Sequence, residues 1–367
     1  MAHIWQLPNT LLVATIYVQP ENFPKGIMNS TTKISNNNAH RPLVSVVMIA
    51  YNSERYIDDA IRGVIAQKGD FDIQLIICDD CSKDSTAAIV EQWTAKYPTR
   101  IDFHRNEKNL GVQGNYLEAF KYVKGDYMAM CDADDYWIDS SKLARQVGYM
   151  ESHPDCSITF HRVINYYEDS RVKSFSNGGQ KADATFDDIS RSNFITNMSV
   201  LYRRKLVDLT QLPEWLNDVR LVDYPMHMFY AAKGKIHYFN RPMGVYRQSE
   251  SAIWSMAQQI YRQEMALLVR LHLLEYFSDK PVNLDGLRVA SKNILVAMIA
   301  DAPENSHLKE VLHEYMQKID PLLTEEALNF EASKRKQTAK APFTKRLLRN
   351  IRIAVSRLLP VPRPPKV

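Results

Sequence analysis

Short runs of apolar residues alternate with amphipathic segments from Leu43 onward. The run LVSVVMIA (43–50) has the length and continuous apolar character of a strand that is buried on both faces. After Ser53, a candidate N-cap, apolar side chains recur at helical spacing: Tyr56, Ile57, Ala60, Ile61, Val64 and Ile65. This order is typical of β-α-β units built around a mostly parallel sheet.

The same alternation continues as far as the acidic motif D-A-D-D (132–135). It predicts further strands at 72–80, 101–106 and 126–132, and helices at 84–97 and 112–125. Three of the predicted strands end in polar or acidic residues. Because ligands bind outside the carboxyl ends of the strands in open α/β sheets, we expect these ends to form one site.

The pattern after Trp137 is mixed. It predicts, in order, a helix at about 140–152, a strand at 157–167, a polar loop over 168–182, an extended segment at 195–203, a helix that opens at Asp223, and two strands at 235–240 and 243–247. Beyond Ser255 apolar residues recur at helical spacing to about residue 331, which predicts a helical region.

Composition indicates a folded globular chain. Hydrophobic residues make up 45% and charged residues 24% of the 367 residues, which is close to the globular average. No internal repeat is visible, so repeat architectures are excluded. Four cysteines are too few for a disulfide framework in a chain of this length, which favours a reducing compartment. No apolar run reaches the roughly 18 residues that a membrane-spanning helix needs.

The net charge of +4 hides an uneven distribution, because residues 332–367 carry eleven Lys and Arg and no acidic residue. An apolar stripe runs along this tail at helical spacing: Phe343, Leu347, Ile351, Ala354, Val355, Leu358 and Leu359. The remaining face is basic, as in helices that lie on anionic membranes. We expect an anionic membrane surface as the partner and no nucleic acid; packing on the protein's own body is the alternative.

Two acidic motifs follow predicted strands. Asp132-Ala133-Asp134-Asp135 places three carboxylates within four residues, which suits Mg²⁺ or Mn²⁺, although an acidic turn that caps the next helix has the same pattern. Asp79-Asp80 offers carboxylates to the N–H of a base or to a ribose hydroxyl, although a βα turn with an N-cap explains it equally well. From the motifs alone, both interpretations stay open.

Taken in series, the segments resemble the GT-A glycosyltransferases of the large inverting family 2. The resemblance covers about residues 42–255 and rests on 42–67, 77–86, 109–115 and 125–137 with Lys142, Leu143 and Gln146, and then on Asp223-Tyr224-Pro225 and KGKIHYFNRPMGVYR. It implies an α/β GT-A (nucleotide-diphospho-sugar transferase) fold, with a mostly parallel central sheet flanked by helices and a C-terminal helical extension.

This resemblance also implies an organisation into parts. We expect a flexible leader at 1–41, a nucleotide-binding half at 42–135 and an acceptor half at 136–255 that together form the GT-A domain, a helical region at 256–331, and the basic amphipathic tail at 332–367.

The resemblance assigns roles to individual residues. Asp223 matches the general base, and Arg247 a position associated with the diphosphate, although Gln248 and Ser249 stand where relatives often have His. Either Asp134 or Asp135 matches the ligand of a Mn²⁺ or Mg²⁺ ion. The expected nucleotide-binding residues are Ala50, Tyr51, Asn52, Glu54, Asp80, Asn115 and Asp132.

The implied activity is inverting transfer of a sugar from a nucleotide-sugar, with UDP as the expected nucleotide, to a hydroxyl of a saccharide or lipid-linked saccharide. The implied setting is bacterial surface polysaccharide or lipopolysaccharide synthesis on the inner face of the cytoplasmic membrane. The alternatives are a sugar-nucleotide pyrophosphorylase, whose glycine-rich first loop is absent from A-Y-N-S-E-R, and a non-catalytic nucleotide-sugar-binding protein.

Overall fold

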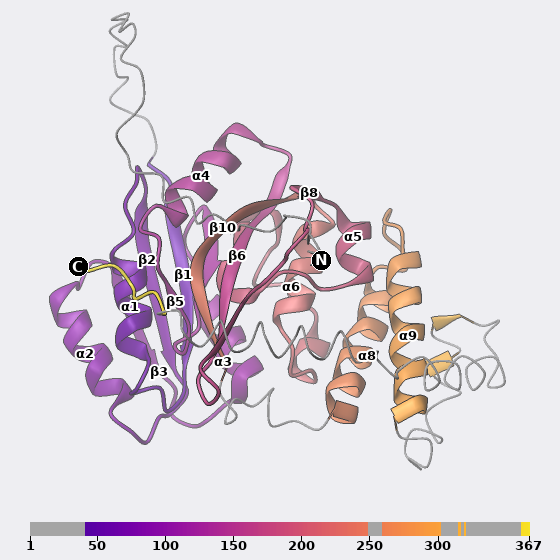
Figure 1. Cartoon of the computed structure of the whole chain (residues 1–367), viewed down its shortest axis with the longest axis horizontal. Helices are drawn as coiled ribbons and strands as arrows, with labels where there is room; N and C mark the ends of the chain where they lie inside the picture. Colours follow the sequence, from indigo (N-terminus) through magenta and orange to yellow (C-terminus); the bar gives the residue numbers. More distant parts are fainter. Residues whose placement is uncertain (1–40, 249–258, 302–314, 317–318, 321–360) are drawn as a thin grey trace, which may run out of the picture. The chain divides into compact units, whose positions relative to one another are not determined.

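A mixed β-sheet with helices on both faces forms the centre of the structure (Figure 1). The computed structural model describes residues 41–248, 259–301, 315–316, 319–320 and 361–367. Within these ranges ten strands form one sheet, in the order β3-β2-β1-β4-β9-β6-β10-β5, with β7 paired to β6 and β8 paired to β10.

The first half of the sheet is parallel, as the sequence predicts. Strands β1 (Leu43–Ala50), β2 (Asp72–Asp79), β3 (Ile101–Arg105) and β4 (Tyr127–Met130) alternate with helices α1 (Ile57–Ile65), α2 (Thr86–Lys96) and α3 (Gly111–Phe120). Alternate residues of β1 enter opposite cores, since Val46 packs with α1 and Val47 packs with α3. This double burial explains the uninterrupted apolar run in the sequence.

Helix α3 ends at Phe120, five residues before the predicted end at Gly125. The chain leaves the helix in order to pass over β1, where the Gly125 N–H donates a hydrogen bond to Ser45 Oγ at 2.8 Å. A Cβ atom at Gly125 would lie 2.6 Å from the backbone of both Leu43 and Ser45. The glycine therefore marks a close approach to β1 rather than the end of the helix.

The second half mixes parallel and antiparallel strands. It contains β5 (Tyr136–Trp137), α4 (Lys142–Ser152), β6 (Cys156–Tyr167), β7 (Val172–Phe175), β8 (Asp183–Ala184), α5 (Phe186–Arg191), β9 (Leu201–Arg203), α6 (Asp223–Ala231) and β10 (Lys235–Gln248). Strand β9 runs antiparallel to both β4 and β6, and β10 runs parallel to β6. The carboxyl ends of β1, β4, β6 and β10 therefore lie at one edge of the sheet.

Three details differ from the predicted elements. The two strands predicted at 235–240 and 243–247 form the single strand β10, whose register against β6 shifts between Phe239 and Gly244. The predicted polar loop contains β7, which forms a hairpin with β6. The predicted extended segment at 195–203 begins instead with the 3₁₀ turn Asn197–Ser199 and continues as β9.

Two long helices, α8 (Gln259–Tyr276) and α9 (Asp285–Asp301), form the C-terminal extension within the described residues. They pack against each other and share the core of the sheet's second half; for example, the rings of Phe186 in α5 and Phe277 after α8 meet edge to face, with their centroids 5.1 Å apart. None of the described helices is both long and apolar enough to cross a membrane.

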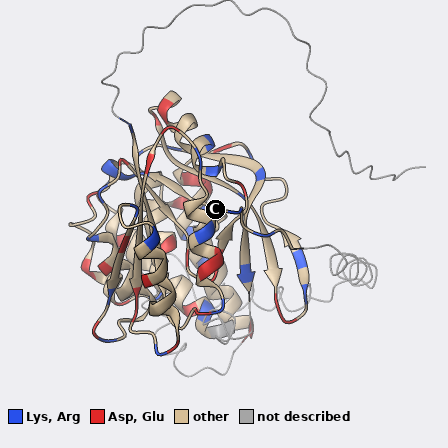
Figure 2. Ribbon diagram, turned by 90° about the vertical axis from the view of Figure 1, so that its left-hand side faces the viewer, with Lys and Arg blue, Asp and Glu red and all other residues tan. Residues whose placement is uncertain are grey.

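The described C-terminal segment, 361–367, begins beside β5 at the edge of the sheet (Figure 1). Val361 packs with Tyr136, Ile164 and Val245, and the Tyr136 hydroxyl donates a hydrogen bond of 2.7 Å to the Pro362 carbonyl. The basic helix predicted between residues 343 and 359 lies outside the described residues. Figure 2 shows acidic and basic residues interspersed over the described part of the chain, in contrast to the wholly basic tail sequence.

Candidate active site

Two loops after β1 and β2 are joined at the sheet edge by side chains that the sequence analysis assigned to the nucleotide. Asn52 has a φ of 48°; its N–H donates to Ser82 Oγ at 2.9 Å, and its Oδ1 accepts from the Lys83 N–H at 2.8 Å. Glu54 Oε2 accepts from the Ser85 N–H at 2.9 Å. These polar groups therefore shape the first loop, whereas the Tyr51 side chain beside them is 48% exposed.

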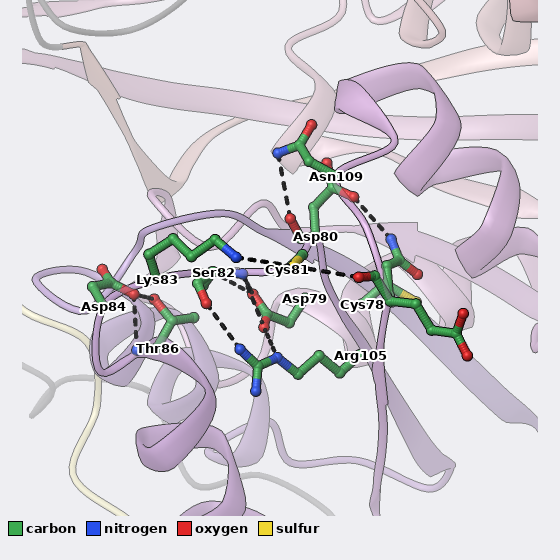
Figure 3. A network of polar contacts seen from close by, with 12 residues as sticks. Cys78, Asp79, Asp80, Cys81, Ser82, Lys83, Asp84, Thr86, Arg105 and Asn109 are labelled. Atoms are coloured by element: carbon green, nitrogen blue, oxygen red, sulfur yellow. Dashed lines mark hydrogen bonds and ion pairs between the residues drawn. The ribbon is translucent and has the colours of Figure 1, made fainter.

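The neighbouring aspartates Asp79 and Asp80 are both buried but have different partners. Asp79 Oδ2 pairs with Arg105 Nε at 3.2 Å, and its carboxylate also accepts from Ser82, as Figure 3 shows. Asp80 accepts hydrogen bonds from the N–H groups of Leu110 at 2.8 Å and Gly111 at 2.9 Å, at the start of α3. The Asp80 carboxylate thus fixes α3 against the end of β2.

Asn115 is buried one turn into α3 and both ends of its amide are occupied. Its Nδ2 donates to the Cys78 carbonyl at 2.9 Å, and its Oδ1 accepts from Asn106 Nδ2 at 3.0 Å. Asn106 in turn donates to Asp80 Oδ1 at 2.9 Å. In this structure Asn115 supports the position of Asp80; its predicted contact with the nucleotide stays a prediction.

Asp132, at the end of β4, is held by two partners that come from distant parts of the chain. The Tyr116 hydroxyl of α3 donates to its Oδ1, and Asn197 Nδ2 of the 3₁₀ turn donates to its Oδ2 at 3.3 Å. Asn197 Nδ2 also donates to the Tyr116 hydroxyl oxygen at 2.7 Å. Burial, followed by the charge of Asp134, raises the pKa of Asp132 to about 7.

The two candidate metal ligands have different surroundings. Asp134 is exposed as a whole residue, although burial of its carboxylate raises its pKa. Asp135 is buried, and its Oδ1 accepts a hydrogen bond of 2.9 Å from the Arg247 N–H of β10. Burial and then the charges of Asp134 and Asp132 raise the pKa of Asp135 well above its ordinary value. Asp134 is therefore more accessible to a ligand than Asp135, which ties the acidic motif to β10.

Arg247 joins several elements around this motif. Its guanidinium forms an ion pair of 2.5 Å with Asp59 of α1 and donates to the Asp134 carbonyl at 3.1 Å. The same group lies over the rings of Tyr136, at 4.3 Å, and Tyr56, at 5.1 Å. The structure therefore gives Arg247 a carboxylate partner within the protein, and its predicted contact with a diphosphate stays a prediction.

Asp223 occupies the first helical position of α6, as the sequence predicts. Burial raises the pKa of the Asp223 carboxyl group. Its charge contributes to the raised pKa of Asp132, so the two carboxylates lie close enough to interact. Burial raises the pKa of the Tyr246 hydroxyl in β10, and the charges of Asp135, Asp134, Asp132 and Asp223 raise it further. Tyr246 is therefore within electrostatic range of both the acidic motif and Asp223. The fold thus brings together the acidic motif and Asp223, which are 88 residues or more apart in the sequence.

Sequence reasoning missed Tyr116, Asn197 and Tyr246. Tyr116 follows Asn115 directly in the third-helix motif, so a helical projection of that motif could have suggested it as a site residue. Tyr246 directly precedes Arg247 in a segment that carries the resemblance, but nothing in that segment singles it out, and Asn197 carries no local signal; both approach the acidic motif through the pairing of β9 and β10 with the rest of the sheet.

The carboxylate oxygens of the D-A-D-D motif are the donor type that a hard divalent cation prefers. Within the described residues, however, no three His, Cys, Asp or Glu side chains are arranged as a ready-made metal site. Asp132 and Asp135 already accept hydrogen bonds from protein groups, so Asp134 is the member that best fits a metal ion. One protein carboxylate suits a metal that takes its remaining ligands from substrate phosphates and water.

Residues 45–210 match the model of Glycosyl transferase family 2. The chain is 35% identical over 215 residues to an uncharacterized protein of Mycobacterium tuberculosis. This alignment covers 58% of this chain and 61% of that protein. It therefore spans about 61% of the length of this relative.

Two further relatives have descriptive names. The putative teichuronic acid biosynthesis glycosyltransferase TuaG of Bacillus subtilis is 28% identical over 244 residues, 64% of this chain and 92% of that one. The Escherichia coli UDP-Glc:alpha-D-GlcNAc-diphosphoundecaprenol beta-1,3-glucosyltransferase WfaP is 34% identical over 125 residues, 34% of this chain and 46% of that one.

Solved structures share the fold at low sequence identity. S. aureus TarS in complex with UDP-GlcNAc superimposes with a TM-score of 0.59 at 16% identity, over 81% of this chain and 93% of that chain. The mannosyltransferase PcManGT of Pyrobaculum calidifontis, in complex with GDP-Man and Mn²⁺, has a TM-score of 0.50 at 17% identity, over 82% and 89%. Together with the family match over residues 45–210 and the named relatives, these likenesses agree with the predicted resemblance: residues 45–210 are similar to glycosyltransferase family 2, and the described part of the chain shares the GT-A fold.

Proposed function

We propose that this protein is a glycosyltransferase that moves a sugar from a nucleotide-sugar, with UDP as the nucleotide, to a hydroxyl of a saccharide or lipid-linked saccharide in bacterial surface polysaccharide or lipopolysaccharide synthesis. The observation that carries the proposal is that Asp223 lies within electrostatic range of the D-A-D-D carboxylates, since its charge contributes to the raised pKa of both Asp132 and Tyr246. This arrangement sets a carboxylate able to accept a proton next to carboxylates suited to a metal-bound diphosphate.

The names of relatives support the choice of substrates. WfaP is named for a UDP-sugar donor and a diphosphoundecaprenol-linked acceptor, TuaG for teichuronic acid biosynthesis, and TarS was solved with UDP-GlcNAc. A lipid-linked acceptor is also consistent with the basic amphipathic tail predicted at 332–367.

The proposed reaction is a single displacement. Asp223 accepts the proton of the acceptor hydroxyl, the hydroxyl oxygen attacks the anomeric carbon from the side opposite the diphosphate, and the anomeric configuration inverts. Asp134 would hold a Mn²⁺ or Mg²⁺ ion, which when bound neutralises charge on the departing diphosphate. Tyr116 and Asn197 keep the Asp132 carboxylate in one orientation.

The alternatives from the sequence have less support. A pyrophosphorylase is disfavoured by the family match and by the first loop, which has no glycine and is held by Asn52 and Glu54. A non-catalytic binding protein has no need for a carboxylate with the raised pKa of Asp223 beside the donor site.

The donor assignment can be tested by protection against thermal unfolding. We expect one or a few UDP-sugars, added with Mn²⁺, to raise the Tm, because a ligand that binds only the folded state stabilises it by mass action. GDP-, ADP- and dTDP-sugars serve as comparison donors. A panel in which no nucleotide-sugar raises the Tm would contradict the proposal.

We further propose that the tail attaches the enzyme to anionic membranes. The test replaces Lys345, Arg346, Arg349, Arg352 and Arg357 by Gln and leaves 361–367 unchanged, because those last residues contact Tyr136. Each basic residue near an anionic surface contributes on the order of 1 kcal/mol, so we expect vesicle binding to fall by more than about tenfold. Sedimentation with phosphatidylserine vesicles measures it, phosphatidylcholine vesicles serve as the control, and equal binding of both proteins would refute the assignment.

A further inference from the structure

Asn197 has one polar atom that the protein leaves unpaired. Its Nδ2 donates to the Tyr116 hydroxyl oxygen at 2.7 Å and to Asp132 Oδ2 at 3.3 Å, which uses both hydrogens of the amide. Its Oδ1 is buried and has no hydrogen-bond partner among the described residues. Because a buried acceptor without a donor is unfavourable, this atom indicates a place for a donor that the protein itself does not supply.

The unpaired atom is held firmly in place. The 3₁₀ turn Asn197–Ser199 is fixed by the Trp137 indole N–H, which donates to the Met198 carbonyl at 2.8 Å, and by Gln146 Nε2, which donates to the Ser199 carbonyl at 3.0 Å. Met198 also packs against β10 where Gly244 has no side chain, since a Cβ there would lie 2.3 Å from Met198 Cε. With its Nδ2 bound on one side, the Asn197 amide presents Oδ1 in one direction.

The chemistry of this atom narrows the class of partner. A carbonyl oxygen accepts hydrogen bonds, so the oxygens of a diphosphate, which also accept, do not satisfy it. Asn197 donates to Asp132, the first carboxylate of the D-A-D-D motif, so its amide lies at the edge of the proposed donor site. The hydroxyl donors of a nucleotide-sugar at this place are those of the ribose and of the transferred sugar.

We propose that Asn197 Oδ1 accepts a hydrogen bond from a hydroxyl group of the bound nucleotide-sugar and so contributes to donor specificity. This inference rests on the proposed function. The Tyr116–Asp132–Asn197 group then contributes in two ways. Its internal hydrogen bonds fix the Asp132 carboxylate, and its remaining acceptor, Asn197 Oδ1, binds a hydroxyl of the nucleotide-sugar.

The test is Asn197→Ala, with Ser199→Ala as the matched control in the same turn, because Ser199 Oγ bonds only locally to the Thr196 carbonyl at 2.6 Å. Calorimetry gives the Kd of each protein for UDP, for the best UDP-sugar, and for its deoxyribose and deoxy-sugar analogues. We expect Asn197→Ala to weaken UDP-sugar binding about tenfold and the control to stay near wild type. If a ribose hydroxyl is the partner, the substitution should weaken UDP binding by the same factor as UDP-sugar binding. If a hydroxyl of the transferred sugar is the partner, the Kd for UDP should not change.

The analogues separate recognition from a merely structural role. For the analogue that lacks the partner hydroxyl, wild type and Asn197→Ala should bind with the same affinity. An equal loss for every analogue, or a shift in the Mn²⁺ concentration needed for binding, would overturn the inference, as would an unchanged UDP-sugar affinity. A wild-type protein that binds no nucleotide-sugar would overturn the proposed function as well, so the two failures are distinguishable.

Discussion

Replacing Asp223 by Asn is expected to lower turnover by roughly 10²- to 10⁴-fold, the usual range for the loss of a general base, while donor affinity is largely kept. The substitution preserves the shape of the side chain at the start of α6 and removes only its basicity. Steady-state rates of nucleoside diphosphate release and the Kd of the UDP-sugar measure the two effects separately. The exposed Asp218, just before α6, provides the matched control as Asp218→Asn, for which we expect near-normal turnover.

The pH dependence gives a second measure of the same residue. Burial raises the pKa of Asp223, so its basic form is lost, as the pH falls, at a higher pH than for an ordinary aspartate. We therefore expect the rate to rise with pH through this pKa in the wild type, and the low residual rate of Asp223→Asn to lack that limb. Near-normal turnover of Asp223→Asn would show that another residue is the base; a loss of turnover in Asp218→Asn would then point to Asp218, and otherwise Glu214 would be tested next.

Removal of divalent ions is expected to reduce turnover to background, and added Mn²⁺ or Mg²⁺ should restore it, because the metal offsets charge on the leaving diphosphate. Titration with EDTA followed by Mn²⁺ is the measurement. Full turnover in excess EDTA would show that the carboxylates at 132–135 serve another purpose.

The two candidate ligands are expected to behave differently. Asp134→Asn should raise the Mn²⁺ concentration needed for half-maximal activity, since the exposed Asp134 is the member that best fits the metal. Asp135→Asn should act mainly through the hydrogen bond to the Arg247 N–H, so we expect a lower Tm with a smaller change in Mn²⁺ dependence. The reverse pattern would assign the metal to Asp135.

Sequence predicted the parallel half of the sheet well because β1, β2 and β4 are largely buried and their sequences are mostly apolar, interrupted only by a few polar residues such as Ser45 and Gln74. It missed β7, whose residues are partly or fully exposed and give no apolar signal. It divided β10 in two because Asn240, Arg241 and Pro242 interrupt the pattern, while the register shifts let the strand continue.

The candidate site was predictable where a motif carries the chemistry, as for Asp132, Asp134 and Asp223. The sequence could not predict which candidate side chains already have hydrogen-bond or ion-pair partners within the protein. Asn115 and Arg247 look available in the sequence, but the fold gives Asn115 partners in Cys78 and Asn106, and pairs Arg247 with Asp59. Such partners depend on packing between α1, α3 and β10 rather than on local sequence.

The most direct test of the proposed reaction is time-resolved proton NMR of the purified enzyme with Mn²⁺ and an α-linked UDP-sugar, without acceptor. Water then replaces the acceptor hydroxyl, so the anomer that forms first reports the stereochemistry before mutarotation. The account predicts release of UDP together with the β-anomer of the free sugar, both strongly reduced in Asp223→Asn. Release of the α-anomer first, or an equal rate in the variant, would contradict it.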